Sequence, residues 1–309
     1  VKDLTITSGR TLTVKQGNVL QVSGNVSVSG VGSALIFESN SGVEFCGDGA
    51  SAQQISGVTT FENVLFNTET DAARVEFDSP ITINGDANFV NGIAVANVIF
   101  GANANCAGGS RKSHINGTAT KNGGSDFLFP VGYNGVYGGV KGDFAGPMTV
   151  GYSFSSEGYD DDVMPSVDPE ENVCAEENTP GIASVSGVEM WSIPNAMSNV
   201  TVYWDGGSNR MNSDDPEAEW NEDNVCLAFW SGTCWRNLQA TSHGNAESGY
   251  MELESDIPAA AKVASRCITM GFSATFSPLP IELVEFSAEC NGASARISWI
   301  TDSERNNEY

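Results

Sequence analysis

The chain has 309 residues, of which 40% are hydrophobic and 17% charged, so it is long enough for two or three domains with apolar cores. Its 39 acidic and 14 basic side chains give a net charge of −25, and such a chain repels nucleic acids and anionic membrane surfaces. No run of about eighteen apolar residues occurs, which argues against membrane insertion. The chain opens at Val1, and we expect any targeting peptide to have been removed or omitted.

Short apolar runs recur about every eight residues through the first hundred residues. Leu4, Leu12, Leu20 and Val28 mark this interval, and each belongs to a run in which apolar and polar residues alternate. Alternation predicts strands with one buried and one exposed face, and the Gly, Asn and Ser residues between them predict turns. Equal spacing with repeated turns predicts a β-solenoid over residues 1–110, with roughly three strands per coil. A β-sandwich is the alternative, but it would usually show longer strands and a longer crossing loop.

The middle of the chain changes character after a belt rich in glycine and asparagine at 101–125. Alternating runs return at 147–154, 188–193, 200–204 and 226–230, separated by two long acidic loops. Several strands of this kind predict a β-sandwich over residues 111–276. The fold class is therefore all-β, and loops as long as 155–184 are usually functional or mobile.

The last segment, 277–309, begins with a linker stiffened by Pro278 and Pro280. Two alternating runs follow, and they predict the first strands of an Ig-like module. Because two strands alone make no stable sheet, one hypothesis is that they complete a sheet on another copy of the chain. The assembly residues would be Ile281, Leu283, Phe286, Cys290, Ile297 and Trp299. The alternative is that further domains follow and were cleaved, disordered or omitted.

Seven cysteines are scattered along the chain without any CxxC pair, which favours disulfides formed outside the cytosol over a zinc site. Cys226 and Cys234 flank a predicted hairpin and are one candidate pair. Cys46 and Cys106 are a second candidate pair, which would tie a solenoid coil to the end of the solenoid. The odd count leaves one thiol over, and Cys290 is the candidate for it.

No catalytic site is predicted. The two histidines, His114 and His243, do not support a Ser/His/Asp set, and no phosphate-binding glycine loop follows a strand. The acidic side chains of the solenoid do not recur beside a basic residue, so we interpret them as solvated turn carboxylates rather than the acid pair of a polysaccharide-cleaving enzyme. These residues are Glu38, Glu44, Asp48, Asp71, Glu76, Asp78 and Asp86.

Two binding hypotheses remain open from the residues. The acidic loops supply hard oxygen ligands for Ca²⁺, although neither has a known calcium-loop spacing, and solvated loops are the alternative. The weak calcium candidates are Asp160, Asp161, Asp162, Asp214, Asp215 and Glu217. Tryptophans could form a carbohydrate platform, but at strand positions they are more often core. Those at strand positions are Trp191, Trp204, Trp230 and Trp235, and Trp220 is the best candidate for exposure.

Several segments resemble secreted, multidomain surface proteins of the Bacteroidetes that are exported by the type IX route. They are Phe-Leu-Phe-Pro-Val-Gly at 127–132, Val-Glu-Met-Trp at 188–191, Phe-Trp-Ser-Gly-Thr-Cys-Trp at 229–235, and the stretches 279–286 and 299–309. The resemblance implies secretion, an extracellular or cell-surface location and the start of a fibronectin-like module. It supplies no catalytic residues.

The leading hypothesis is a secreted structural protein that self-assembles through strand pairing into a fibre, filament or adhesin. The alternative is a carbohydrate-binding or carbohydrate-processing module of a larger cell-surface enzyme. A groove with exposed aromatic residues and paired carboxylates would favour the alternative, whereas strand pairing between subunits would favour the first.

Overall fold

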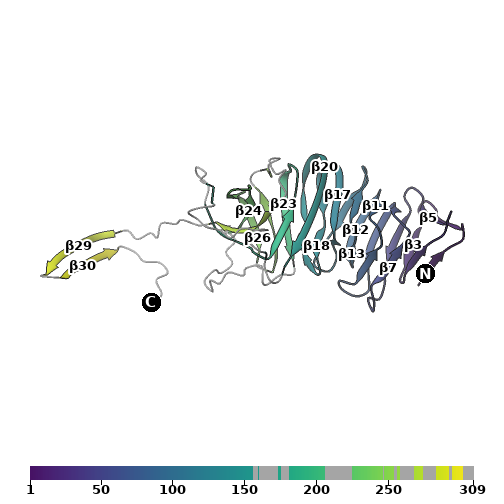
Figure 1. Cartoon of the computed structure of the whole chain (residues 1–309), viewed down its shortest axis with the longest axis horizontal. Helices are drawn as coiled ribbons and strands as arrows, with labels where there is room; N and C mark the ends of the chain where they lie inside the picture. Colours follow the sequence, from purple (N-terminus) through teal and green to yellow (C-terminus); the bar gives the residue numbers. More distant parts are fainter. Residues whose placement is uncertain are drawn as a thin grey trace. The chain divides into compact units, whose positions relative to one another are not determined.

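The computed structural model describes residues 1–155, 159, 173–174, 181–205, 225–245, 247–253, 256–257 and 268–273, and the backbone of 283–291 and 294–301. All regular structure in these residues is β-strand, as predicted (Figure 1). No helix among them has the length and apolar character needed to cross a membrane. The chain forms two compact units, Val1–Ser273 and Ala274–Tyr309.

The N-terminal part is a β-solenoid of five coils, each built from three short strands, and every strand pair between successive coils is parallel (Figure 1). The first face contains β1 (Leu4–Ile6), β4 (Val26–Val28), β7 (Gln53–Ser56), β10 (Arg74–Phe77) and β13 (Ile93–Val95). The second contains β2 (Thr11–Val14), β5 (Ala34–Phe37), β8 (Thr60–Phe61), β11 (Ile81–Ile83) and β14 (Val98–Phe100). The third contains β3 (Val19–Val22), β6 (Gly42–Phe45), β9 (Asn63–Asn67), β12 (Asp86–Asn91) and β15 (Asn105–Gly108).

Strand register confirms the predicted winding. Leu4 pairs with Val26 and Val19 pairs with Gly42, so equivalent positions of the first two coils lie 22 and 23 residues apart. An eight-residue interval in the sequence is therefore one side of a three-sided coil. The corners use residues that tolerate unusual backbone angles, such as Gly57 at φ 72°, where a Cβ would collide with the carbonyl group of Val28 in the coil before.

The inward side chains form columns that run from coil to coil. Val22, Phe45, Phe66 and Phe89 occupy equivalent positions of β3, β6, β9 and β12, and all are buried. The rings of Phe45 and Phe66 stack at 5.6 Å, and those of Phe66 and Phe89 stack at 4.8 Å. Such a column excludes water from the first coil to the fourth and adds ring–ring attraction to hydrophobic burial.

The parallel coils pass into antiparallel strands at β17 (Thr118–Phe129). This strand pairs in parallel with β14 and antiparallel with β20 (Val140–Phe154), so it closes the C-terminal end of the solenoid. The first face continues through β16 (Ile115–Asn116) and β18 (Val131–Tyr133), followed by β19 (Val136–Tyr137). One buried cluster of apolar side chains extends from the coils into the antiparallel region.

The remaining strands of the first unit pair antiparallel. They are β21 (Ile182–Val185), β22 (Glu189–Ser192), β23 (Ser198–Asp205), β24 (Val225–Trp230), β25 (Trp235–Asn237), β26 (Ala240–Gly244), β27 (Ser248–Leu253) and β28 (Ile268–Ser273). All belong to the same hydrogen-bonded sheet as the first face of the solenoid. The β-sandwich predicted for 111–276 therefore stays a prediction.

The second unit contains a single described hairpin, in which β29 (Leu283–Asn291) pairs antiparallel with β30 (Ser294–Thr301). These are the two strands predicted from the alternating runs of the last segment. The Ig-like module that they were expected to begin also stays a prediction.

Candidate functional site

The first coil presents strand edges that have no partner on one side among the described residues. The register joins β1 to β4 and β2 to β5. The amide of Leu4 donates to Asn25 and the carbonyl of Ile6 accepts from Ser29, both in the second coil, so the N–H and C=O of Thr5 between them point the other way. The edge of β3 is partly covered, because the Val1 ammonium group donates to the Gln21 carbonyl at 2.7 Å. We call β1 and β2 the first-coil edge.

The surroundings of the first-coil edge are apolar and basic. Five of the nine exposed large apolar side chains in the described residues belong to the first two coils, and Val31 among them is fully exposed. Residues 1–22 contain Lys2, Arg10 and Lys15 against the single acid Asp3, whereas the whole chain is strongly acidic. Lys15 is paired with Glu38 at 2.6 Å. The edge therefore has a charge opposite to that of most of the chain.

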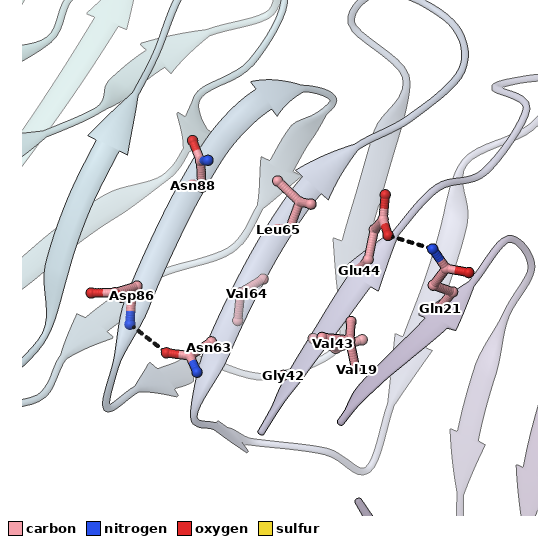
Figure 2. A pocket seen from close by; sticks show the side chains of 10 residues that line it. All are labelled: Val19, Gln21, Gly42, Val43, Glu44, Asn63, Val64, Leu65, Asp86 and Asn88. Atoms are coloured by element: carbon pink, nitrogen blue, oxygen red, sulfur yellow. Dashed lines mark hydrogen bonds between the residues drawn. The ribbon is translucent and has the colours of Figure 1, made fainter. Parts of the chain in front are cut away.

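A groove of about 570 Å³ lies on the outer side of the third face, across β3, β6, β9 and β12 (Figure 2). Gly42 lies between Val19 of β3 and Asn63 of β9 in a second row, where it contributes backbone only. Gln21, Glu44, Leu65 and Asn88 form one row of the groove, because they are paired across the four strands. We call this surface the groove.

The polar side chains of the groove are held by hydrogen bonds. Glu44 accepts from Gln21 at 2.8 Å and from Asn67 at 3.0 Å. Asn63 accepts from the backbone N–H of Asp86 at 2.8 Å and donates to the Ser41 carbonyl at 2.9 Å (Figure 2). These bonds link neighbouring coils, so the amide and carboxylate groups have fixed positions before any ligand arrives.

The other solenoid carboxylates named in the sequence analysis are dispersed. Hydrogen bonds from Lys15 and Gln16 lower the pKa of Glu38, and those from Gln54 and Arg74 lower the pKa of Glu76. A hydrogen bond from Lys112 lowers the pKa of Asp71. Asp48 and Asp78 accept backbone N–H groups, from Ala50 and Gly57 respectively. In the described residues, no three His, Cys, Asp or Glu side chains gather as metal ligands.

The calcium candidates Asp160, Asp161, Asp162, Asp214, Asp215 and Glu217 lie outside the described residues, as does Trp220. The tryptophans at strand positions are core residues. Trp191, Trp204 and Trp235 are at most 1% exposed, and Trp230 is also buried. A carbohydrate platform made of these four side chains is therefore excluded by their burial.

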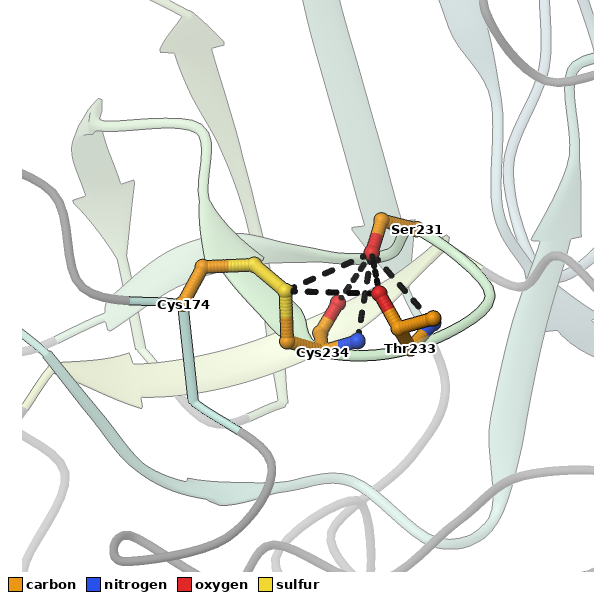
Figure 3. The surroundings of a disulfide bond; sticks show 4 residues. All are labelled: Cys174, Ser231, Thr233 and Cys234. Carbon is orange, nitrogen blue, oxygen red and sulfur yellow. Dashed lines mark hydrogen bonds between the residues drawn. A yellow bond between two sulfur atoms is a disulfide. The ribbon is translucent and has the colours of Figure 1, made fainter.

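The predicted bridge between Cys226 and Cys234 is wrong. Cys234 is bonded to Cys174 instead, with 5.2 Å between the Cα atoms (Figure 3). The turn of the hairpin lies at 231–234, where Ser231 and Cys234 share a backbone hydrogen bond of 3.0 Å. Cys226 is five residues further back along β24, or roughly 17 Å at the rise of a strand, and its thiol is free and buried.

The predicted pair Cys46 and Cys106 is also not formed, and both thiols are free. Cys46 follows β6, whereas Cys106 lies in β15, with β9 and β12 between these strands. Three strand spacings amount to about 14 Å, well beyond the reach of a disulfide. Burial raises the pKa of both thiols, which keeps them protonated and unreactive. The side chain of Cys290 lies outside the described residues, so its role as the odd thiol stays a prediction.

Two buried basic side chains near the end of the solenoid were not singled out from the sequence. His114 is fully buried, its Nδ1 lies 3.0 Å from the Ser110 carbonyl, and burial lowers its pKa to about 4. Lys121 is 4% exposed and donates to the carbonyls of Gly101 and Ala102 at 2.8 and 3.1 Å. Lys121 is paired with Phe100, so it lies next to Phe100 in the same inward column. The apolar column therefore ends in a charged group, which is bonded to the carbonyls of the turn after β14.

Five of the six predicted assembly residues lie on the strands of the hairpin in the second unit. Register pairs Phe286 with Trp299 and Ala288 with Ile297. Leu283 and Cys290 also lie on β29, and Ile281 falls outside the described residues. Neither β29 nor β30 has another strand partner in the part of the chain that the structure describes.

No protein family model, no curated protein and no solved structure matches this chain.

Proposed function

We propose that this protein is a secreted structural subunit of an extracellular or cell-surface fibre, filament or adhesin, and that its copies join by strand pairing. The observation that carries the proposal is the first-coil edge, whose backbone groups have no strand partner in the described residues. Free strand edges bind other strands readily, and proteins that remain separate usually protect them. The disulfide between Cys174 and Cys234 supports an oxidising location.

The hairpin β29–β30 is the proposed partner of the first-coil edge on another copy. A two-stranded hairpin is marginally stable alone, so a third strand would stabilise it. Residues 274–309 contain six acidic and two basic side chains, opposite in sign to the first coil. Pairing would satisfy backbone groups on both sides and would place opposite charges near each other.

The test compares two variants of the full chain by multi-angle light scattering. Thr5→Pro combined with Thr13→Pro removes N–H donors from the first-coil edge, because both residues lie between positions that bond to the second coil. The matched control, Thr5→Ala with Thr13→Ala, keeps these donors. We expect the wild type and the alanine control to form oligomers or filaments, and the proline variant to be monomeric.

A second arm removes residues 279–309, which contain the proposed donor strands. We expect this truncated chain to remain monomeric, and electron microscopy should show filaments only for chains that keep both parts. A wild type that is monomeric at all concentrations would contradict the proposal. Unchanged assembly after the truncation would contradict the role given to the hairpin.

A further inference from the structure

We propose that the groove binds a neutral polysaccharide strand, which lies along the stacking direction of the coils and crosses β3, β6, β9 and β12. This inference is independent of self-assembly, because the groove belongs to a single copy of the chain (Figure 2). It also requires no catalytic group.

Charge excludes one class of ligand. The groove contains two carboxylates, Glu44 and Asp86, and none of its lining residues is a lysine, arginine or histidine. A phosphate, sulfate or uronate chain would bring negative charge to this surface without any cation to meet it, and nearby like charges repel. A chain of uncharged sugars meets no such penalty.

Surface chemistry favours hydroxyl groups as partners. Carboxylates accept hydrogen bonds, and side-chain amides both donate and accept them, so Glu44, Asn63, Asp86 and Asn88 offer both functions in one groove. Leu65, which lies between Glu44 and Asn88 in the same row, offers an apolar contact. A sugar ring has hydroxyl groups at its rim and C–H groups on its faces, so it needs this combination of polar and apolar contacts.

Spacing favours a chain over a single small molecule. Neighbouring strands of a sheet lie about 4.8 Å apart, so equivalent side chains repeat at that interval along the stacking direction. An extended chain of β-linked pyranose rings advances by a similar distance per sugar. One sugar per coil can therefore lie beside each member of the row in turn, from Gln21 to Asn88.

Rigidity lowers the cost of binding. Glu44 is fixed by Gln21 and Asn67, and Asn63 is fixed by the Ser41 carbonyl and the Asp86 amide. Side chains that are already ordered lose little conformational entropy when a ligand arrives. The groove is therefore suited to a ligand with weak but repeated contacts, such as a glycan strand.

The test is isothermal titration of the full chain with neutral β-1,4-linked hexasaccharides of glucose, xylose, mannose and N-acetylglucosamine, and with an anionic hexauronate. We expect at least one neutral hexasaccharide to bind, its disaccharide to bind more weakly, and the hexauronate not to bind. Leu65→Arg should weaken binding by about tenfold or more, because it places a long side chain in the middle of the row.

The matched control is Ile99→Arg, which makes the same change at an exposed strand residue, 45% accessible, on the second face. It should bind like the wild type. If Leu65→Arg fails to fold, Asn88→Ala, at an exposed position of the same row, provides the same test with a smaller expected loss. The proposal is overturned if no neutral hexasaccharide binds, if the hexauronate binds equally well, or if the folded groove variant binds as tightly as Ile99→Arg.

Discussion

Apolar side chains are buried by different strand arrangements in the parallel coils β1–β15 and in the antiparallel region β17–β28. In the coils, each strand pairs with residues about one coil away, as when Val64 pairs with Ala87. In the antiparallel region, local hairpins such as β24–β25 occur beside pairs that join distant segments, as when Tyr203 meets Tyr250 or when Ser186 donates to Met270. Local repetition therefore leaves a period in the sequence, and distant pairing leaves none.

The two regions also differ in what holds them together. The coils are held together by repeated columns of apolar side chains. Their two cysteines, Cys46 and Cys106, both have free thiols. The antiparallel region adds a covalent link between Cys174 and Cys234, which closes a loop with a sequence separation of 60 residues. Mutations in each region should reveal whether the shared core makes them unfold together.

The largest effect is expected in the coils, from Phe66→Ala. Phe66 is fully buried and stacks between Phe45 and Phe89, so its removal leaves a cavity in the column. We expect the free energy of unfolding to fall by about 3–5 kcal/mol in urea titrations. The control Ile99→Ala, at an exposed strand residue, should change it by about 0.5 kcal/mol or less.

Fluorescence and circular dichroism together show whether the coils and the antiparallel region unfold at the same urea concentration. All six tryptophans lie at or beyond position 191, so tryptophan fluorescence reports on the later part of the chain, whereas circular dichroism reports on all strands. Because one buried cluster crosses β17, we expect Phe66→Ala to shift both transitions equally. A shift in circular dichroism alone would show that the coils unfold independently, and a loss below about 1 kcal/mol would contradict the column argument.

The second effect is expected in the antiparallel region, from Cys174→Ser combined with Cys234→Ser. Removing the link frees a long loop of the unfolded chain, which should lower the free energy of unfolding by roughly 2–4 kcal/mol. The measurement is urea unfolding followed by fluorescence, because Trp235 is adjacent to Cys234 and packs 5.3 Å from Trp230. With reductant present, wild type and variant should become equally stable, and a difference that persists would show that packing, not the link, is responsible.

The sequence was informative where side chains repeat and uninformative where distant segments meet. The runs at Leu4, Leu20 and Val43 lie in observed strands, because alternation requires only that one side of a strand be buried. The partner of Cys234 could not be predicted, because Cys174 precedes β24 by some fifty residues and spacing does not determine disulfide pairing. The hairpin itself was expected, and it is observed between β24 and β25, where Trp230 pairs with Trp235.

Only part of the groove could be predicted from the sequence. The outward positions of the third face are visible as the polar members of alternating runs, and Glu44 and Asp86 were noted as carboxylates. Their alignment with Gln21, Leu65 and Asn88 depends on the length of each coil, which varies: Val64 and Ala87 are 23 residues apart, whereas Ala87 and Cys106 are 19 apart. Because the coils differ in length, the rows cannot be recognised in the sequence before the strand register is known.

The smallest effect concerns the boundary between the two regions and depends on pH. His114 precedes β16, is fully buried and has a pKa of about 4, lowered by burial and opposed by the Ser110 carbonyl and the charge of Asp205. In the unfolded chain its pKa is about 6.5, so between these values the unfolded chain binds the proton more strongly. The contribution of His114 to the free energy of unfolding is therefore complete above pH 6.5 and is lost as the pH falls toward 4. The loss is about 2 kcal/mol at pH 5.

The measurement is the pH dependence of the free energy of unfolding between pH 7 and 5, in wild type, His114→Gln and His243→Gln. Glutamine does not titrate, so His114→Gln should lose about 2 kcal/mol less than wild type over this range, whatever its stability at pH 7. His243 lies on β26, away from the boundary, and its variant controls for the loss of a histidine elsewhere in the chain. An unchanged slope in His114→Gln would mean that the imidazole is not held neutral in the folded chain. The boundary between the coils and the antiparallel region would then tolerate a charge that its burial argues against.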